Sequence, residues 1–352
     1  MEKQVRCPKC RTIIATRGLP GEIQSIQCPS CGLAGKVTFS KKQMQGKSAI
    51  RVINLKKKYG DLLAVNSISF MVKQGEIFAF LGPNGAGKTT TVEMIESIRK
   101  PTEGTISLFD LNIGTSFDTI KERIGILPQE FHSFERLTVR ETLNYYAGLF
   151  KKQADIDEIL EMMDLKTHSA KLYKELSGGL KQRVGVAISL VNDPDIVFLD
   201  EPTTGLDPKA RREVWNVIAD LRNRGKTIFL TTHYMEEAEY LADHIAIIHK
   251  GTIIAEGTLD ELMEQYGHGS VLNIRNCNHP QIASMLTQQG FSASQNDNGT
   301  VSIPIDYTDK ILEILSWLRH ECIEYEGIDI RRPNLEEIFL HLTGAKLKEE
   351  QT

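Results

Sequence analysis

One stretch decides the fold of this chain: Gly82-Pro83-Asn84-Gly85-Ala86-Gly87-Lys88-Thr89-Thr90. It satisfies the pattern G-x-x-x-x-G-K-[ST] and lies between an expected strand, Glu76–Leu81, and an expected helix, Lys88–Ile98. The glycines let backbone N–H groups converge on phosphates, Lys88 reaches the β- and γ-phosphates, and Thr89 presents its hydroxyl to Mg²⁺. The positive end of the helix points at the same anion. The stretch therefore predicts a site for a nucleoside triphosphate and Mg²⁺.

The second half of this site comes 112 residues after Lys88, in Ile196-Val197-Phe198-Leu199-Asp200-Glu201. Four consecutive apolar residues are typical of a strand that is buried on both faces. Open α/β sheets bind their ligands at the carboxyl ends of such strands. We therefore expect Asp200 to hold Mg²⁺ and Glu201 to polarise an attacking water. The alternative is a buried strand that simply ends in two acidic residues.

Strand-like and helix-like runs alternate between residues 49 and 267, which predicts an α/β fold built on a parallel sheet. The expected strands are Ala49–Leu55, Ser67–Val72, Glu76–Leu81, Ile124–Pro128, Ile196–Asp200, Thr227–Thr231, His244–His249 and Thr252–Glu256. The expected helices include Lys88–Ile98, Val139–Lys151 and Lys209–Asn223.

A third motif, Leu176-Ser177-Gly178-Gly179-Leu180-Lys181-Gln182-Arg183, begins 24 residues before Asp200. In sequence and position it resembles the signature motif of the ABC ATPases. The position after the two glycines is commonly Gln in that family and is Leu180 here. The resemblance covers residues 49–267 and implies a P-loop ABC ATPase core with a helical subdomain.

Four further residues follow the order of the same family, and the resemblance gives each a role. Tyr59 stands where an aromatic ring stacks on adenine, and Gln129 matches the Q-loop. Asp207 matches the D-loop, and His233 matches the switch histidine. The catalytic residues implied are Lys88, Gln129, Glu201 and His233, and the Mg²⁺ ligands are Thr89, Gln129 and Asp200. The nucleotide-binding residues implied are Tyr59, Gly82 through Thr90, Ser177, Gly178, Gly179, Asp200 and Asp207.

The resemblance also implies a mechanism, Mg²⁺-dependent ATP hydrolysis in a head-to-tail dimer. ATP would lie between the Lys88 loop of one copy and the Ser177-Gly178-Gly179 motif of the other. Ser177 is placed to cap a helix through Lys181–Leu190, so this motif offers the γ-phosphate a second helix N-terminus. Because the chain carries one set of motifs, a second ATPase subunit is required, and we expect a homodimer. The region from Gln129 to Glu141 is predicted to grip a membrane-spanning partner.

The first 40 residues form a cysteine module in which Cys7-Pro8-Lys9-Cys10 and Cys28-Pro29-Ser30-Cys31 are separated by 17 residues. This spacing is typical of a zinc ribbon, in which Cys7, Cys10, Cys28 and Cys31 fill all four positions of a structural Zn²⁺. A module of this size needs the metal to fold. A rubredoxin-like iron site and two disulfides are the alternatives. Residues 41–48 are polar and are predicted to be a linker.

Charge is distributed unevenly along the chain. Residues 1–48 carry a formal charge of +7, so the rest of the chain, whose total is −4, carries −11. A basic arm suggests an anionic partner, either lipid headgroups or nucleic acid, and a solvated surface is the alternative.

Residues 268–352 are predicted to form a separate accessory domain. Their expected elements follow the order βαββαβ of a ferredoxin-like α+β unit, with a last helix near Asn334–Leu342. The ending from Asn334 to Gly344 resembles the C-terminal extension of drug-, antibiotic- and sodium-export ATPases, which favours export over import.

No apolar run approaches the ~18 residues of a membrane-spanning helix, and the N-terminus lacks the apolar segment of a secretory signal. We therefore expect a cytoplasmic protein that is peripheral on the cytoplasmic face of the membrane and works with a separate permease subunit. The main alternative is an ABC-type ATPase that acts on nucleic acid through its zinc module. Nucleic acid is the less favoured partner, because such relatives have tandem cores or long coiled coils. A non-hydrolysing adaptor is disfavoured because Lys88, Asp200, Glu201 and His233 are all present.

Overall fold

The computed structural model describes most of the chain. The described residues are 2–6, 13–17, 23–32, 34–38, 47–129, 131–267, 270–275, 281–296, 299–305, 308–331 and 334–343.

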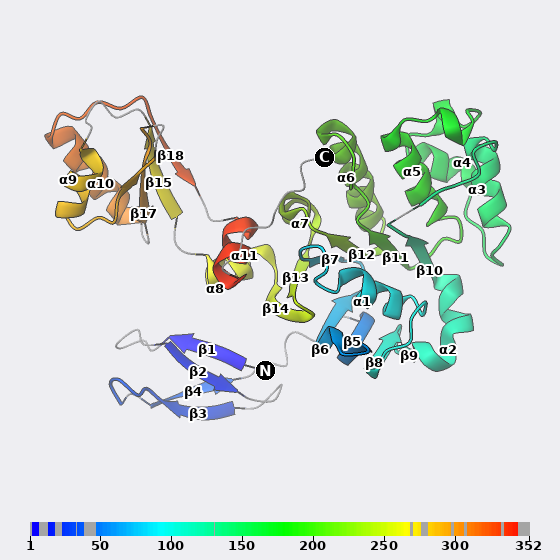
Figure 1. The fold of residues 1–352 in the computed structure, drawn as a ribbon, viewed down its shortest axis with the longest axis horizontal. Coiled ribbons are helices and arrows are strands. Elements are labelled where there is room, and N and C mark those ends of the chain that lie inside the picture. The colour runs from blue at the N-terminus through cyan, green and yellow to red at the C-terminus, as the bar shows by residue number, and fades with distance from the viewer. Residues whose placement is uncertain are drawn as a thin grey trace.

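The centre of the molecule is a six-stranded sheet (Figure 1). In spatial order its strands are β10 (Ile124–Leu127), β11 (Ile196–Asp200), β12 (Thr227–Thr232), β7 (Ile77–Leu81), β13 (His244–His249) and β14 (Thr252–Gly257). The first five are parallel, and β14 pairs antiparallel with β13. Every residue of β7, β11 and β12 is buried, as expected of strands covered on both faces. The carboxyl ends of these strands therefore meet at one edge.

A second, antiparallel sheet has the order β6 (Leu62–Lys73), β5 (Ser48–Tyr59), β8 (Glu103–Leu108) and β9 (Leu111–Asn112). The predicted parallel core is present in the central sheet, whereas the expected strands Ala49–Leu55 and Ser67–Val72 lie in β5 and β6 of this antiparallel sheet. Only Gly60 and Asp61 separate these two strands, and a parallel pair needs a crossover of about a dozen residues. Gly60 adopts a positive φ of 55°, which suits a tight hairpin.

Helices surround the central sheet. They are α1 (Lys88–Ile95), α2 (Ile113–Ile120), α3 (Val139–Ala147), α4 (Ile156–Met162), α5 (Gly178–Ile188), α6 (Pro208–Asn223), α7 (Met235–Leu241) and α8 (Leu259–Tyr266). The start of α3 is fixed by a capping box, in which the Thr138 hydroxyl accepts from the Glu141 N–H and the Glu141 carboxylate accepts from the Thr138 N–H.

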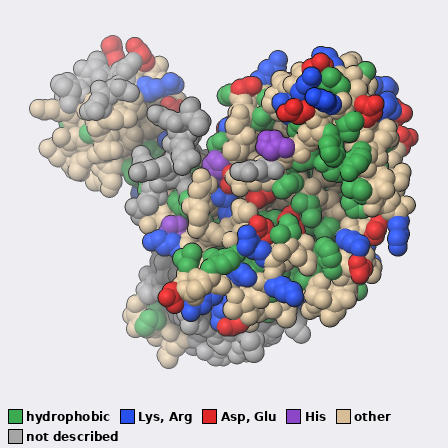
Figure 2. Space-filling model, turned by 45° about the vertical axis from the view of Figure 1, so that its right-hand side comes forward, with side chains coloured by type: hydrophobic (Ala, Val, Ile, Leu, Met, Phe, Trp, Pro, Cys, Tyr) green, Lys and Arg blue, Asp and Glu red, His purple; other side chains and the backbone are tan. Residues whose placement is uncertain are grey.

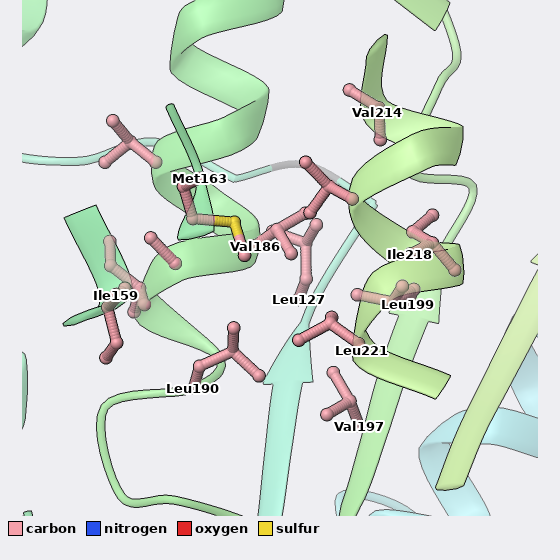
Figure 3. Close-up of a cluster of buried hydrophobic side chains, with 14 of the residues drawn as sticks. Leu127, Ile159, Met163, Val186, Leu190, Val197, Leu199, Val214, Ile218 and Leu221 are labelled. Atoms are coloured by element: carbon pink, nitrogen blue, oxygen red, sulfur yellow. The ribbon is translucent and has the colours of Figure 1, made fainter. Parts of the chain in front are cut away.

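Helices α3, α4 and α5 form a helical lobe that packs on one end of the sheet. Figure 3 shows the shared core, where Ile159 and Met163 from the α4 region and Val186 from α5 meet Leu127 of β10 and Ile218 of α6. All five side chains are nearly or fully buried. Because burial of one such side chain contributes about 1.5–3 kcal/mol, this cluster holds the lobe to the sheet.

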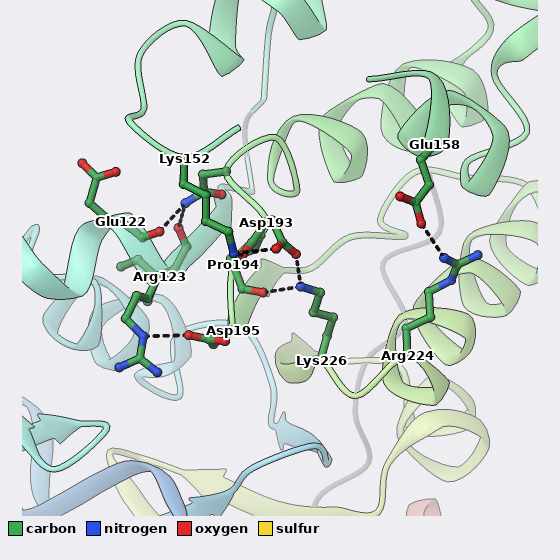
Figure 4. A network of polar contacts seen from close by, with 11 residues as sticks. Glu122, Arg123, Lys152, Glu158, Asp193, Pro194, Asp195, Arg224 and Lys226 are labelled. Atoms are coloured by element: carbon green, nitrogen blue, oxygen red, sulfur yellow. Dashed lines mark hydrogen bonds and ion pairs between the residues drawn. The ribbon is translucent and has the colours of Figure 1, made fainter. Parts of the chain in front are cut away.

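Charged side chains cross the same seam nearer the surface (Figure 4). Asp193 pairs with both Lys152 and Lys226, and Arg224 at the end of α6 pairs with Glu158 of α4 at 3.1 Å. Exposed ion pairs contribute only about 0–1 kcal/mol each. The apolar cluster, rather than these pairs, therefore dominates the attachment.

The C-terminal region has its own sheet, in the order β16 (Ser294–Gln295), β17 (Val301–Ile305), β15 (Ser270–Arg275) and β18 (Gly327–Arg331), with all neighbours antiparallel. Its helices are α9 (Ile282–Gln288) and α10 (Thr308–His320), and they share a separate apolar core with the strands. The elements follow one another along the chain as βαββαβ.

The last helix, α11 (Leu335–Thr343), packs against α7 and α8 rather than on the C-terminal sheet. Leu335, Ile338 and Phe339 are buried there, and the Leu335 N–H donates to Glu239 of α7 at 2.7 Å. The division of the chain at residue 268 stays a prediction, but α11 is physically part of the ATPase core.

The N-terminal region contains two hairpins, β1 (Glu2–Arg6) with β2 (Ile13–Arg17) and β3 (Ile23–Gln27) with β4 (Ala34–Thr38). Cys28 and Cys31 are described, whereas Cys7 and Cys10 lie outside the described residues. Over the part of the chain that the structure describes, no helix has the length and apolarity needed to cross a membrane.

Candidate active site

The phosphate loop connects β7 to α1, as the sequence predicts. Gly87 has a φ of 105°, and a Cβ there would lie 2.6 Å from the Ala64 carbonyl oxygen, so only glycine fits. No side chain caps α1, which leaves its first N–H groups directed at the loop. These donors and the helix dipole form an anion site at the sheet edge.

Lys88 is almost fully buried at the start of α1. Its Nζ donates to the Gly82 carbonyl at 2.8 Å and to the Pro83 carbonyl at 3.3 Å. It also pairs with the Glu201 carboxylate at 3.0 Å. The ammonium group is thus held within the loop that surrounds the predicted phosphate position.

Glu201 follows β11 with a positive φ of 48°, an uncommon conformation for a residue other than glycine. Its N–H donates to the Thr231 hydroxyl at 3.0 Å, which fixes this turn. Burial disfavours the carboxylate, but the hydrogen bond from His233 and the charge of Lys88 lower the pKa of Glu201 to about 2. Glu201 is therefore an anion at neutral pH.

His233 lies between β12 and α7, and its Nδ1 is 3.0 Å from Glu201 Oε2. The neighbouring strands β11 and β12 bring the two residues together, although they are 32 positions apart in sequence. Glu201 therefore contacts His233 through one carboxylate oxygen and Lys88 through the other.

The chemistry of Thr89 and Asp200 suits Mg²⁺, which prefers hydroxyl, carboxylate and phosphate oxygens. Burial raises the pKa of Asp200, although hydrogen bonds from Thr231 and Thr89 and the charge of Lys88 oppose the rise. Thr89 and Asp200 are therefore close neighbours. Gln129, the third predicted ligand, follows the edge strand β10 and is exposed.

Tyr59 ends strand β5 and is partly exposed. The ammonium of Lys57 lies 5.1 Å from the centroid of its ring, and the guanidinium of Arg99 lies 5.7 Å away. Arg99 also pairs with Glu93 of α1, so Tyr59 stands beside the helix that carries Lys88. The prediction that this ring stacks on adenine is untested.

The signature motif lies on the helical lobe. Ser177 caps α5 as predicted, and its hydroxyl accepts from the Leu180 N–H at 3.4 Å. A Cβ on Gly179 would lie 2.9 Å from that of Ala210, so the motif packs closely against α6. Asp207 caps α6 by accepting from the Lys209 and Ala210 N–H groups. Within one chain α5 packs on α3, α6 and β10, whereas α1 packs on β6 and β11, so the fold does not bring Ser177 to Lys88.

Sequence reasoning missed several residues of the site. The Thr231 hydroxyl donates to Asp200, and the Thr204 hydroxyl donates to Glu201 at 3.2 Å. Glu96, at the end of α1, is buried, and the nearby charge of Asp200 contributes to a raised pKa of Glu96. Two threonines directly after the apolar run Ile228–Leu230 are the signal that could have identified Thr231.

Comparison with known proteins agrees with this geometry. Residues 65–204 match the family model described as ABC transporter. The chain is 36% identical over 304 residues to the daunorubicin resistance ATP-binding protein of Streptomyces coeruleorubidus, covering 84% of this chain and 96% of that protein. It is 38% identical over 302 residues to the Nod factor export ATP-binding protein I of Burkholderia orbicola, covering 84% and 97%.

The chain belongs to the ABC transporter family. Solved structures agree: an ATP-binding subunit of an ABC transporter superposes with a TM-score of 0.56 at 28% identity, covering 62% of this chain and 93% of that one. A dimeric bacterial ABC transporter cassette superposes with a TM-score of 0.54 at 28% identity, covering 60% of this chain and 98% of that one. This ABC ATPase accordingly binds and hydrolyses ATP.

In this ABC ATPase, catalysis depends on positioning and electrostatics. Lys88 and the uncapped end of α1 are predicted to attract and orient the phosphates. Thr89 and Asp200 would hold Mg²⁺, which would supply charge neutralisation to the phosphates. Glu201 is kept ionised between Lys88 and His233, so its oxygens can accept a hydrogen bond from a water beside the γ-phosphate. His233, whose Nδ1 lies 3.0 Å from Glu201 Oε2, is placed to orient that carboxylate.

Proposed function

We propose that this ABC ATPase lies on the cytoplasmic face of the membrane. There it would drive export through a separate membrane-spanning partner. The observation that carries the motor function is the Lys88–Glu201–His233 cluster, which is complete in a single chain. Export is supported by the relatives: those named above act in daunorubicin resistance and Nod factor export, and a 32% identical protein of Bacillus subtilis is named for linearmycin resistance.

Two copies are proposed to form the working unit. Ser177 lies on the helical lobe, apart from the Lys88 loop of the same chain, and both Ser177 and Asp207 are exposed. A head-to-tail pairing would let Ser177 of one copy offer a capped helix N-terminus to the phosphates of the other. The dimeric structure of a bacterial ABC transporter cassette, to which this chain is similar, supports this arrangement.

The surface proposed to grip the membrane partner is an exposed patch of Phe134, Tyr145 and Leu149. These side chains are 46%, 51% and 64% exposed. Phe134 and Tyr145 meet edge to face with ring centroids 4.9 Å apart. Figure 2, turned to bring the side of the helical lobe forward, shows hydrophobic side chains gathered on this face. Phe131, near the start of the region from Gln129 to Glu141 that is predicted to grip the partner, instead packs inward against Tyr173.

The N-terminal module is proposed to hold one structural Zn²⁺ on Cys7, Cys10, Cys28 and Cys31. Each pair of cysteines falls in the connection between the two strands of a hairpin. Cys28 is 2% exposed, and the Gly32 N–H closes a turn onto the Cys28 carbonyl at 2.9 Å. Among the described residues no three potential ligands cluster, and two of the four proposed ones lie outside that set.

The zinc proposal is tested by measuring bound metal in the purified chain. We expect one zinc per chain, lost in Cys28→Ser and in Cys31→Ser. Cys322→Ser, which changes a cysteine outside the module, should retain it. Zinc-free wild-type protein from cells grown with ample zinc would contradict the proposal.

Residues 270–331 are proposed to be a ferredoxin-like accessory domain. The strand order β16-β17-β15-β18, all antiparallel, supports this, as does the βαββαβ sequence of elements. Expression of this segment alone tests whether it folds by itself.

The export proposal is tested by isolating the chain from its native membranes. We expect a polytopic membrane protein to co-purify and the ATPase rate to change when the two are reconstituted together. Recovery of nucleic acid in place of a membrane chain would favour the alternative of an ATPase acting on nucleic acid.

A further inference from the structure

The switch histidine belongs to a continuous row of four side chains. The rings of His233 and Tyr234 have centroids 4.1 Å apart and are inclined by 42°. The guanidinium carbon of Arg211 lies 4.0 Å from the centroid of the Tyr234 ring. At the other end of the row, His233 Nδ1 lies 3.0 Å from Glu201 Oε2. Arg211 and Tyr234 thus reach the catalytic carboxylate through one imidazole.

The backbone holds both outer residues of the row in place. The Tyr234 N–H donates to the Thr232 hydroxyl at 2.9 Å, at the start of α7. Arg211 is in the first turn of α6, where its N–H donates to the Asp207 carbonyl at 2.9 Å. The Nε of Arg211 is buried and has no hydrogen-bond partner in the part of the chain that is described. The guanidinium thus stacks on Tyr234, and its charge also acts on Glu237.

A buried carboxylate fixes α6 and α7 relative to each other beneath this row. Glu237 of α7 accepts from the Trp215 indole of α6 at 2.8 Å and from the Thr203 hydroxyl at 2.7 Å. Burial raises the pKa of Glu237, while these hydrogen bonds and the charge of Arg211 oppose the rise. Because Glu237 is anchored on both sides, the separation of Arg211 and Tyr234 is set by the core.

We infer that Tyr234 and Arg211 are positioning residues for ATP hydrolysis, which hold the His233 imidazole in the plane that directs Nδ1 at Glu201. The torsion that turns an imidazole about its own axis is soft, so packing must choose the ring plane. Tyr234 restricts that torsion by contact, and Arg211 holds the Tyr234 ring through a cation–π interaction. Neither residue needs to touch the nucleotide.

Steady-state ATPase kinetics test this inference. We expect Tyr234→Leu and Arg211→Leu each to lower kcat by about tenfold, the scale of a lost partly buried cation–π contact. The KM for ATP should stay within about twofold, because Lys88 and its loop are unchanged. Tyr234→Phe keeps the ring and should retain nearly the full rate, which separates positioning from a general packing defect.

Arg212 provides the matched control. It neighbours Arg211 on the same helix but points to the surface, where it pairs with Glu236 at 3.3 Å. Arg212→Leu should keep the wild-type kcat. The double variant Tyr234→Leu with Arg211→Leu should be no slower than either single one, because the two residues act in series. Multiplied losses in the double variant, an equal loss in Arg212→Leu, or a raised KM with unchanged kcat would overturn the inference.

Discussion

The ammonium of Lys88 lies 3.0 Å from the carboxylate of Glu201, and both side chains are 4% exposed. This buried pair joins Lys88, which is predicted to bind phosphate, to Glu201, which is predicted to polarise the attacking water. Each charge compensates the other, since an isolated buried charge is costly. Removal of either partner therefore has effects beyond its own role.

Lys88→Ala is expected to abolish Mg²⁺-dependent ATPase activity, with a loss of at least about 100-fold in kcat/KM. The phosphates lose a fixed cation, and loss of one such group is typically of this size. Release of inorganic phosphate measures the effect. Lys181→Ala is the control for nucleotide binding. Lys181 lies on α5 rather than in the phosphate loop, so this variant should still bind ATP, whereas Lys88→Ala should bind it poorly.

Glu201→Gln is expected to bind ATP but hydrolyse it slowly, so that a nucleotide-bound dimer accumulates. The amide removes a negative charge beside the phosphates while leaving Lys88 and the loop intact. Light scattering in the presence of ATP measures the dimer. An equal dimer content in Lys88→Ala would count against a site shared between two copies.

Glu96→Gln is expected to stabilise the protein at alkaline pH. Burial, followed by the charges of Asp200 and Glu93, raises the pKa of Glu96 to about 8 from 4.5. Between these two values the unfolded chain has lost this proton and the folded chain has kept it. The free energy of unfolding should therefore fall as pH rises through this window, by up to about 1.4 kcal/mol per pH unit.

Thermal or urea unfolding at several pH values between about 5 and 8.5 tests whether the free energy of unfolding falls as pH rises. The stability advantage of Glu96→Gln over the wild type should grow with pH and level off above pH 8. Glu135→Gln, at an exposed position, should follow the wild type throughout. A constant difference at all pH values would exclude a proton held by Glu96.

Leu149→Glu is expected to uncouple transport from hydrolysis. A charge in the exposed patch of Phe134, Tyr145 and Leu149 weakens an apolar contact with a membrane partner, yet it lies outside the ATP site. Transport should fall at least about tenfold with basal ATPase unchanged. Leu312→Glu is the control, since Leu312 of α10 is 63% exposed against 64% for Leu149. Normal transport by Leu149→Glu would remove this surface from consideration.

Deletion of residues 1–40 is expected to leave ATPase activity intact and to weaken assembly with the membrane partner. Residues 1–48 have a formal charge of +7. Four thiolates on Zn²⁺ carry −2, so residues 1–48 with zinc bound keep a charge of about +5. Its docking on an anionic surface should weaken steeply as salt rises. Assembly and DNA binding should be measured side by side. If only DNA binding disappears, the module serves nucleic acid and the export reading of it is wrong.

The sequence by itself determined the chemistry of the nucleotide site. Gly82 to Thr90, Asp200 and Glu201 could be identified because phosphate binding requires N–H groups, a cation and carboxylates in a fixed local order. The order of the further motifs then indicated the family. The position of Ser177 before a helical run indicated that it caps α5. These signals are local, and short-range geometry is encoded within a few residues.

Only the tertiary structure decided which side chains meet over long separations. The contacts of Glu201 with Lys88 and His233, the partners of Thr231, and the row from Arg211 to Glu201 all depend on strand order. Helix packing also decided that α11 returns to the ATPase core. Strand neighbours and helix packing are chosen by burial of apolar surface across the whole chain, and no single window of sequence contains that information.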